Sequence, residues 1–283
     1  LLGLLITVVL CGCSGTTSAP RADSAPSTAA TSSAADPVSP SASPSPPVRL
    51  PAVPKVASCY RLSFGDATHP TSRKPASSCA QSHTAVTIFV GRLDLVVAGH
   101  AIGVDSARAQ RQVSSTCTAK LPGYLGGTTQ ARQLSRFQVV WFSPTLRQAD
   151  AGADWFRCDL VAVGTGAQLM RLPPHDALRH VLDRPQALST YGLCGTAQPG
   201  ASGFRRVPCA ARHSWVAVRT IALRGGAHYP GVPAVRQAGD KTCADVVRRR
   251  TGLALRFQYG WEWPTSAQWT SGQHYGYCWS PTS

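Results

Sequence analysis

The chain has 283 residues, and its 28 Lys and Arg against 13 Asp and Glu give a net charge of +15 at neutral pH. A protein this basic attracts anionic partners through its long-range field, although a GC-rich coding bias toward Arg would produce the same excess. No apolar run reaches the about 20 residues that a membrane-spanning helix needs. The composition therefore predicts no spanning helix and leaves membrane association to other means.

The chain opens with an uncharged apolar run that ends in small residues and cysteines, LLGLLITVVLCGCSG. Such a run is typical of an export signal, so residues 1–12 are predicted to be a signal peptide, and we expect a basic segment before Leu1. The residues around Cys13 resemble a bacterial lipobox, which predicts that Cys13 is lipidated and becomes the mature N-terminus. Two acyl chains would anchor it stably. The alternative is an ordinary secretory signal with two incidental cysteines.

Residues 13–51 begin with this cysteine and continue almost entirely in Ser, Ala, Pro and Thr. Such a composition buries too little apolar surface to fold. Its proline content predicts an extended tether that spans up to roughly 100 Å. The folded part is therefore predicted to lie outside the cytoplasm, anchored to the outer face of the cell membrane. There it would meet the membrane, an anionic envelope polymer or a division or wall protein, but no nucleic acid.

Eight further cysteines form two sets of four with matching surroundings, and an even number in an exported chain predicts disulfides. Cys79 and Cys209 each begin a Cys-Ala-x-x-His pattern that leads into an alternating, valine-rich run. Near the end of each set, a Trp, a Pro and a Cys recur at a spacing of 120 residues: Trp141 and Trp261, Pro144 and Pro264, and Cys158 and Cys278. This register predicts a tandem duplication.

The two copies are predicted at residues 53–170 and 186–283, joined by the proline-containing segment RLPPHDALRHVLDRPQ. Each copy has one helix candidate, the first capped at Asp105-Ser106 and ended by Pro122-Gly123, the second running from Val232 to Arg250. Strands are predicted at 84–93, 136–144, 158–164, 214–223 and 255–264. The predicted fold class is α+β, with two tandem related small domains. Each has a short, mainly antiparallel sheet, one main helix and two disulfides.

A duplicated unit that folds alone should close its disulfides within itself. The predicted pairs are Cys59–Cys79, Cys117–Cys158, Cys194–Cys209 and Cys243–Cys278. The second bond of each copy would tie the main helix to the last strand. Each bond is expected to contribute roughly 3 kcal/mol by restricting the unfolded chain.

These patterns resemble the septum formation domain family of actinobacterial membrane-anchored proteins and lipoproteins. The matching residues are 56–60, Cys79 to His83, Cys117 and Trp141 to Cys158 in the first copy, and Cys194, Cys209 to His213, Cys243 and Trp261 to Cys278 in the second. The resemblance covers both copies. The name of the family implies a link to cell division and implies no reaction.

His83 and His213 are the most notable polar positions, because each lies four residues after a cysteine in its copy. A metal site would need those cysteines as thiolates, and bridged cysteines leave one His per copy, too few ligands for zinc. We therefore predict no metal and no cofactor. A His that caps the turn before the strand is the favoured interpretation, with ligand binding or proton transfer as the alternative.

The sequence contains no Gly-x-Ser-x-Gly, His-Glu-x-x-His or phosphate-binding Gly-rich motif. Asp150, Asp154 and Asp159 gather near a cysteine, which would suit a two-carboxylate glycosidase, but we expect them in a solvated loop. We therefore predict no catalytic residues.

Tryptophans recur at some equivalent positions of the two copies and not at others. Trp141 and Trp261 recur and are predicted to lie in the core. Trp263, Trp269 and Trp279 do not recur and are predicted to be exposed, where flat rings beside polar groups suit a sugar or a protein partner.

The predicted function is a non-enzymatic, lipid-anchored envelope protein that acts as an interaction module in septum or cell-wall processes. The alternative is an envelope hydrolase with a His-based site between the two copies. A third possibility, a small-molecule or metal binder, would require unbridged cysteines.

Overall fold

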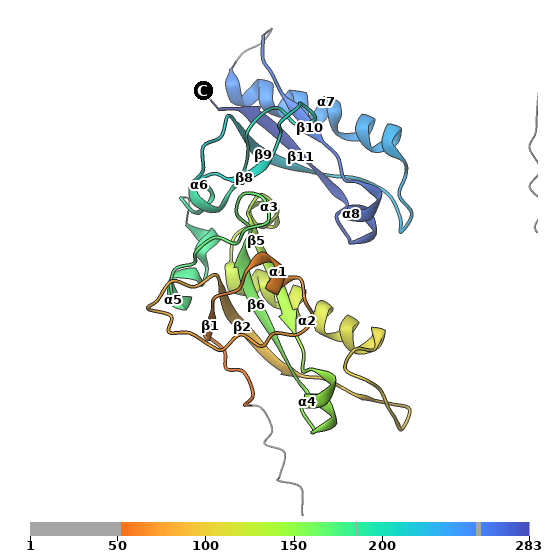
Figure 1. Ribbon diagram of the computed structural model, residues 1–283. Coiled ribbons are helices and arrows are strands. Elements are labelled where there is room, and N and C mark those ends of the chain that lie inside the picture. The colour runs from red at the N-terminus through yellow and green to blue at the C-terminus, as the bar shows by residue number, and fades with distance from the viewer. Residues whose placement is uncertain (1–51, 185, 253–255, 283) are drawn as a thin grey trace, which may run out of the picture. The chain divides into compact units, whose positions relative to one another are not determined.

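A computed structural model describes residues 52–184, 186–252 and 256–282. The predicted signal peptide, Cys13 and the predicted tether lie outside the described residues, as does Pro185. Within the described ranges, helices and antiparallel strands form an α+β fold with two main sheets and four disulfides (Figure 1). Among the helices of this part, none is both long and apolar enough to cross a membrane.

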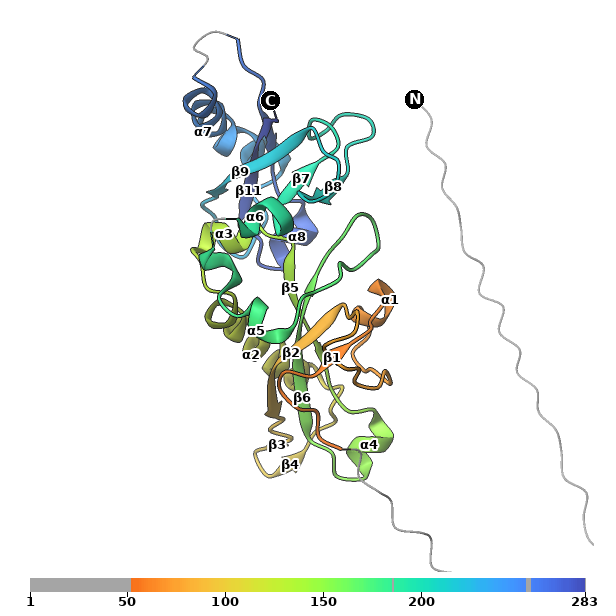
Figure 2. The same ribbon diagram turned by 90° about the vertical axis from the view of Figure 1, so that its left-hand side faces the viewer.

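The first sheet has the strand order β1-β2-β6-β5, and all neighbouring strands are antiparallel. Its strands are β1 (Cys59–Tyr60), β2 (Ala85–Arg92), β5 (Phe137–Phe142) and β6 (Trp155–Ala162). The connections contain α1 (Phe64–Ala67), β3 (Val96–Val97), β4 (His100–Ala101), α2 (Ala107–Leu125), α3 (Thr129–Gln133) and α4 (Leu146–Asp150). Helix α2 packs against β2, β5 and β6, as Figure 2 shows from the side.

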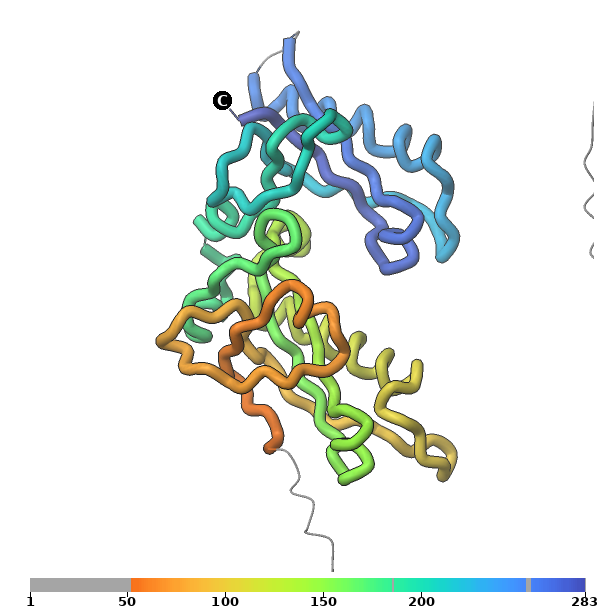
Figure 3. The backbone as a smooth tube through the Cα atoms, viewed as in Figure 1, coloured from red at the N-terminus to blue at the C-terminus, as the bar shows by residue number. Residues whose placement is uncertain are grey.

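The second sheet has the order β10-β11-β9-β7-β8. Its strands are β7 (Leu193–Gly195), β8 (Arg206–Pro208), β9 (Trp215–Ala222), β10 (Gly260–Glu262) and β11 (Tyr275–Pro281), and its helices are α7 (Val232–Thr251) and α8 (Ser266–Thr270). Without the edge strand β8, the order β7-β9-β11-β10 is that of the first sheet. Helix α7 packs against β9, β10 and β11. In Figure 3, α4 and α8 each form a small turn between the last two strands of their sheet.

The segment predicted to join two domains is part of a hydrophobic core. It forms α5 (His175–Leu178) and the 3-10 turn η1 (Val181–Asp183), followed by α6 (Ala187–Tyr191). Leu178, Val181 and Leu182 are buried together with Tyr124 and Leu125 of α2. The described residues belong to one compact unit, so a division into two tandem domains is not confirmed.

Helix α2 runs past its predicted end. Its N-cap is Ser106, as predicted, but it passes through Pro122 and ends at Leu125. A proline removes one helical hydrogen bond. Burial of Tyr124 and Leu125, which are 7% and 1% exposed, holds the last turn in place. Helix α7 ends at Thr251, one residue after the predicted Arg250. The next residue is Gly252, whose φ of 68° is left-handed.

The four disulfides are the pairs that the sequence predicts: Cys59–Cys79, Cys117–Cys158, Cys194–Cys209 and Cys243–Cys278. Cys117 and Cys243 are fully buried. They tie α2 to β6 and α7 to β11, so each main helix is fixed covalently to a central strand of its sheet.

Candidate functional site

Strand β6 crosses the middle of the first sheet, and all eight of its residues are buried. Because side chains alternate along a strand, its residues divide between two environments. Phe156 and Cys158 pack in a cluster with Val113 of α2. Trp155, Arg157 and Asp159 share the opposite face of the strand. We call these last three residues the cavity face of β6.

Arg157 is held between two aromatic rings. Its guanidinium carbon lies 3.7 Å from the centre of the Tyr60 ring and 4.7 Å from the centre of the Phe142 ring, which favours the cation over each ring face. Its side chain is only 5% exposed, and Nε lies 3.1 Å from Oδ2 of Asp159. The two atoms form an ion pair without hydrogen-bond geometry, and Nη2 is buried without a hydrogen-bond partner.

Asp159 is fully buried, and its Oδ1 accepts a hydrogen bond of 2.7 Å from the hydroxyl of Thr87 on β2. Burial raises the pKa of Asp159 to about 6, although the positive charge of Arg157 and the hydrogen bond from Thr87 act in the opposite direction. Desolvation therefore outweighs the attraction within the pair, as is common for buried ion pairs.

The expectation that the three clustered aspartates lie in a solvated loop is wrong for Asp159. Asp150 is exposed at the end of α4, and Asp154 pairs with Arg92 at 2.8 Å near the surface. Asp159 lies in a central strand and faces the Arg157 guanidinium instead. Proximity in sequence could not reveal which aspartate the sheet would cover.

A cavity of about 1170 Å³ lies over the cavity face of β6. Five of its sixteen lining residues are cationic, and among the described residues that line it none is acidic. These cations come from the segment before β1, the loop after α1, the start of α4, and β6: Lys55, Arg73, Lys74, Arg147 and Arg157. The cavity therefore concentrates positive charge.

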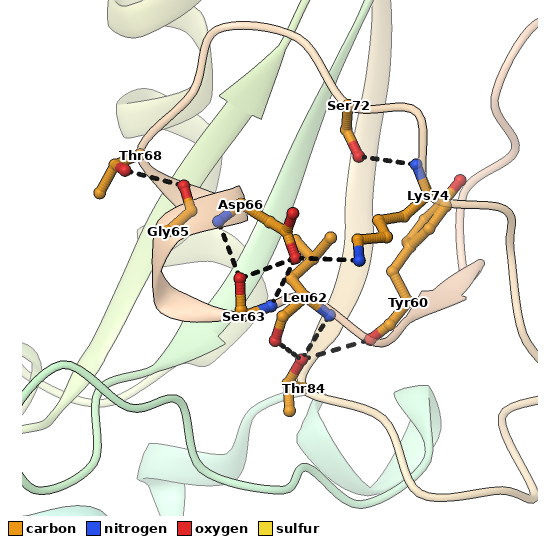
Figure 4. A network of polar contacts seen from close by, with 9 residues as sticks. All are labelled: Tyr60, Leu62, Ser63, Gly65, Asp66, Thr68, Ser72, Lys74 and Thr84. Carbon is orange, nitrogen blue, oxygen red and sulfur yellow. Dashed lines mark hydrogen bonds and ion pairs between the residues drawn. The ribbon is translucent and has the colours of Figure 1, made fainter.

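Lys74 is the one cation of the cavity rim with an ion-pair partner in the described structure. Its Nζ lies 3.5 Å from Oδ2 of Asp66, as Figure 4 shows beside Tyr60. The same oxygen accepts hydrogen bonds of 2.8 Å from the backbone and the hydroxyl of Ser63. The backbone hydrogen bond from Ser63 is the main cause that lowers the pKa of Asp66. The capping box of α1 thus keeps this carboxylate ionised and outside the cavity lining.

Trp155 adds a second unsatisfied donor to the floor of the cavity. It is 7% exposed, and its buried Nε1 has no hydrogen-bond partner. A buried N–H without a partner costs about 1–3 kcal/mol. Trp155 and Arg157, which both line the cavity, therefore each hold a buried N–H without a hydrogen-bond partner in the described structure.

The two predicted histidine sites cap turns. His83 is 1% exposed, and its Nδ1 and Nε2 lie 2.8 and 3.1 Å from the carbonyl oxygens of Gln81 and Pro173. His213 is half-buried, with Nδ1 2.7 Å from the carbonyl oxygen of Ala211. Neither ring contacts a carboxylate in the described structure. The ranges that are described also contain no group of three metal-ligating side chains.

The prediction that Trp269 and Trp279 are exposed is wrong. They are 1% and 0% exposed, and their indole nitrogens donate to the carbonyl oxygen of Gly226 at 3.1 Å and to Oε2 of Glu262 at 3.0 Å. At the 120-residue spacing the first copy has the smaller Ala149 and Asp159. A tryptophan that occurs only in the second copy therefore fills a larger space in the core of that copy and is not a sign of exposure.

Trp263 is half-buried and borders a second cavity of about 520 Å³. The Arg236 guanidinium lies 5.6 Å from the centre of its ring. Trp141 was predicted to be a core residue and is only half-buried, whereas Trp261 is buried at 7% exposure.

The predictions from the sequence do not include the basic cavity. The sequence feature that indicates this cavity is the alternation of Trp155, Arg157 and Asp159 along one strand. At a spacing of 120 residues their counterparts are Tyr275, Tyr277 and Trp279, which carry no charge. A comparison of the two runs position by position would have singled out the first as chemically unusual.

A family model described as septum formation matches residues 56–278. This range contains all eight bridged cysteines and most of the lining of the basic cavity. No curated protein matches the chain, and no solved structure matches it.

Proposed function

The chain belongs to the septum formation family, and from this premise we propose that it is a non-enzymatic interaction module of the cell envelope. In this proposal Cys13 carries the lipid anchor, and the folded part acts outside the cytoplasm at the outer face of the cell membrane. Four disulfides favour that location, because such bonds persist in oxidising compartments.

The proposal includes a tandem origin for the two sheets, with copies at residues 53–170 and 186–283. Three observations support it. The sheets share a strand order, each main helix is bridged to a central strand, and the turns α4 and α8 begin with the capping boxes Thr145–Gln148 and Thr265–Gln268. The capping residues recur at the same spacing of 120 as the tryptophans and prolines.

The basic cavity is the contact site of the module in this proposal. The observation that carries it is the cationic lining of the cavity, which includes two residues, Trp155 and Arg157, that each hold a buried N–H without a partner. Lys55, Arg73 and Arg147 have no ion-pair partner within the described residues. Such a site suits the acidic groups of an envelope polymer or a wall protein.

Binding of the full chain to isolated cell-envelope material tests this contact. The double substitution Arg73→Glu with Arg147→Glu reverses two charges at the cavity rim, and we expect binding at least about tenfold weaker with a shallower salt dependence. The matched control is Arg249→Glu with Arg250→Glu, which makes the same charge change at the exposed end of α7. An equal loss in both variants would assign binding to net charge and reject the cavity as the contact.

The anchor has a separate test. Cys13→Ser removes the sulfur that would be acylated, so we expect the wild type to incorporate a labelled fatty acid in cells and the variant to incorporate none. Equal labelling of the variant, or an unlabelled wild type, would contradict lipidation at this cysteine.

A further inference from the structure

The floor of the basic cavity has the chemistry of an oxyanion site. Arg157 is 4% exposed and Trp155 is 7% exposed, yet each has a buried N–H without a partner. Both line the cavity from alternate positions of β6, so both side chains leave the strand on the same face. Buried N–H donors without partners favour a ligand that brings acceptor oxygens to them.

The Arg157 guanidinium is fixed before any ligand arrives. Tyr60 and Phe142 lie over it at 3.7 and 4.7 Å, and Asp159 holds Nε at 3.1 Å. These contacts leave Nη2 as its buried free donor. A pre-positioned guanidinium loses little conformational entropy on binding, which is why arginine serves so often in phosphate recognition.

The charge around the floor favours a polyanion over a ligand with a single acidic group. Arg157 already has one carboxylate partner in Asp159, while Lys55, Arg73 and Arg147 add three cations without ion-pair partners in the described residues. This excess of positive charge exceeds what one singly charged group, a carboxylate or a phosphodiester, would neutralise, so it favours a polymer with repeated anionic groups. The cavity volume of about 1170 Å³ is also larger than one phosphate group needs, and it leaves room for the chain on either side.

We propose, resting on the proposed function, that this cavity binds a phosphodiester group of an anionic polyol-phosphate or sugar-phosphate polymer. Nη2 of Arg157 and Nε1 of Trp155 donate to the phosphate oxygens. Arg73, Arg147 and Lys55 attract the neighbouring repeats. The donor pair thus sets specificity, and the rim cations set the long-range attraction.

The test titrates the full chain with a short poly(glycerol phosphate) oligomer and follows the indole N–H signal of Trp155 by NMR, with affinity from calorimetry. We expect that signal to shift on binding. Trp155→Phe, which also assigns the signal by its loss, and Arg157→Lys, which keeps the charge and removes Nη2, should each weaken binding about tenfold. The matched control is Tyr277→Phe, at the counterpart of Arg157 on β11, and it should bind as the wild type does.

Thermal unfolding of each variant shows whether it is folded, and Trp155→Phe preserves a test if Arg157→Lys does not fold. An unmoved Trp155 signal, or two folded variants that bind like the wild type, would overturn the proposal. Equal affinity for poly-glutamate of matched charge would reject phosphate specificity. Binding to phosphatidylglycerol vesicles but not to the oligomer, with phosphatidylcholine vesicles as the blank, would assign the phosphate to a lipid headgroup and overturn the polymer.

These outcomes separate this proposal from the proposed function. In one outcome, Arg73→Glu with Arg147→Glu loses binding to envelope material while the wild type does not bind the oligomer. This outcome would keep the cavity as the contact site and reject the phosphodiester as its ligand. A positive oligomer titration without any binding to envelope material would support the site and reject the envelope contact.

Discussion

The cavity face of β6 and the corresponding face of β11 occupy the same place in two sheets that share a strand order apart from the extra edge strand β8, yet they differ in chemistry. Trp155, Arg157 and Asp159 on β6 leave two buried donors without partners and lie under a cavity. On β11 the counterparts are Tyr275, Tyr277 and Trp279, which we call the aromatic face. A shared scaffold therefore supports a polar site in one sheet and a packed wall in the other.

The aromatic face pairs its indole nitrogen with a carboxylate of its own sheet. Trp279 packs edge-on against Phe204 with ring centres 5.4 Å apart, and its Nε1 donates to Glu262. Glu262 also accepts from Arg206, whose guanidinium carbon lies 5.1 Å from the centre of the Tyr277 ring. The cation of this sheet is thus neutralised by a carboxylate on β10. Three alternating residues of a central strand thus distinguish a face that lies under a basic cavity from one that is packed with aromatic rings.

The largest expected effect comes from Trp279, which is fully buried. Trp279→Ala should lower the free energy of unfolding by about 3–5 kcal/mol, because a large cavity replaces the indole. Urea denaturation measures this loss. Asp159→Ala at the counterpart position should also lower the free energy of unfolding, by about 3 kcal/mol, because it leaves the buried Arg157 guanidinium without its counter-charge and the Thr87 hydroxyl without its acceptor. A loss in Trp279→Ala with none in Asp159→Ala would show that Arg157 needs no carboxylate partner.

The pH dependence of stability sharpens the same contrast. Because burial raises the pKa of Asp159 from 3.8 to about 6, the folded protein holds this proton more tightly than the unfolded chain does between those pH values. Its stabilising contribution is therefore fully present below about pH 4 and is lost as pH rises through 6, a change of about 3 kcal/mol.

Asp159→Asn isolates this contribution, because the amide fits the same space, still accepts from Thr87 and does not titrate. We expect the difference in unfolding free energy between the wild type and Asp159→Asn to move in favour of the variant as pH rises from 4 to 7. A difference that is constant over this range would mean that Asp159 titrates alike in the folded and unfolded chains.

Local signals in the sequence predicted much of the fold. The fourfold spacing that ends in Cys117 and Cys243 identified the buried side of each main helix, and both cysteines are fully buried. Ser106 identified the start of α2, because a cap acts within one turn. The disulfide pairs followed from the recurrence of the cysteines. These features depend on neighbours in the chain or on the repeat itself.

The site depended on contacts that the sequence does not display. Arg157 is buried because Tyr60 and Phe142 reach it from other strands, and Asp159 is buried because β2 and β5 flank β6. Trp269 was misjudged for the same reason, since its burial depends on the region around Gly226. Residue type and spacing cannot predict which side chains meet when strands distant in sequence pair.

The smallest expected effects concern the different burial of Trp141 and Trp261. Gly239 on α7 and Gly276 on β11 give Trp261 its space, because a Cβ at either glycine would collide with the indole. The first copy has Val113 where Gly239 lies when the bridged cysteines Cys117 and Cys243 are aligned, and Phe156 at the position 120 residues before Gly276. Both pack in the cluster that includes Trp141, and there Trp141 is half-buried. Gly239 therefore allows the Trp261 indole to approach the backbone of α7 closely, although glycine lowers helix propensity.

Gly239→Ala should lower the free energy of unfolding by about 1–3 kcal/mol, since the rigid indole cannot yield without losing its packing and the hydrogen bond from Nε1 to the Val235 carbonyl. The control is Gly123→Ala in α2, where a Cβ meets nothing within 4 Å, so better helix propensity should raise stability by about 0.5–1 kcal/mol. Thermal unfolding of both variants measures the opposite signs. A gain of stability in both variants would show that Trp261 repacks freely and that its burial does not require Gly239.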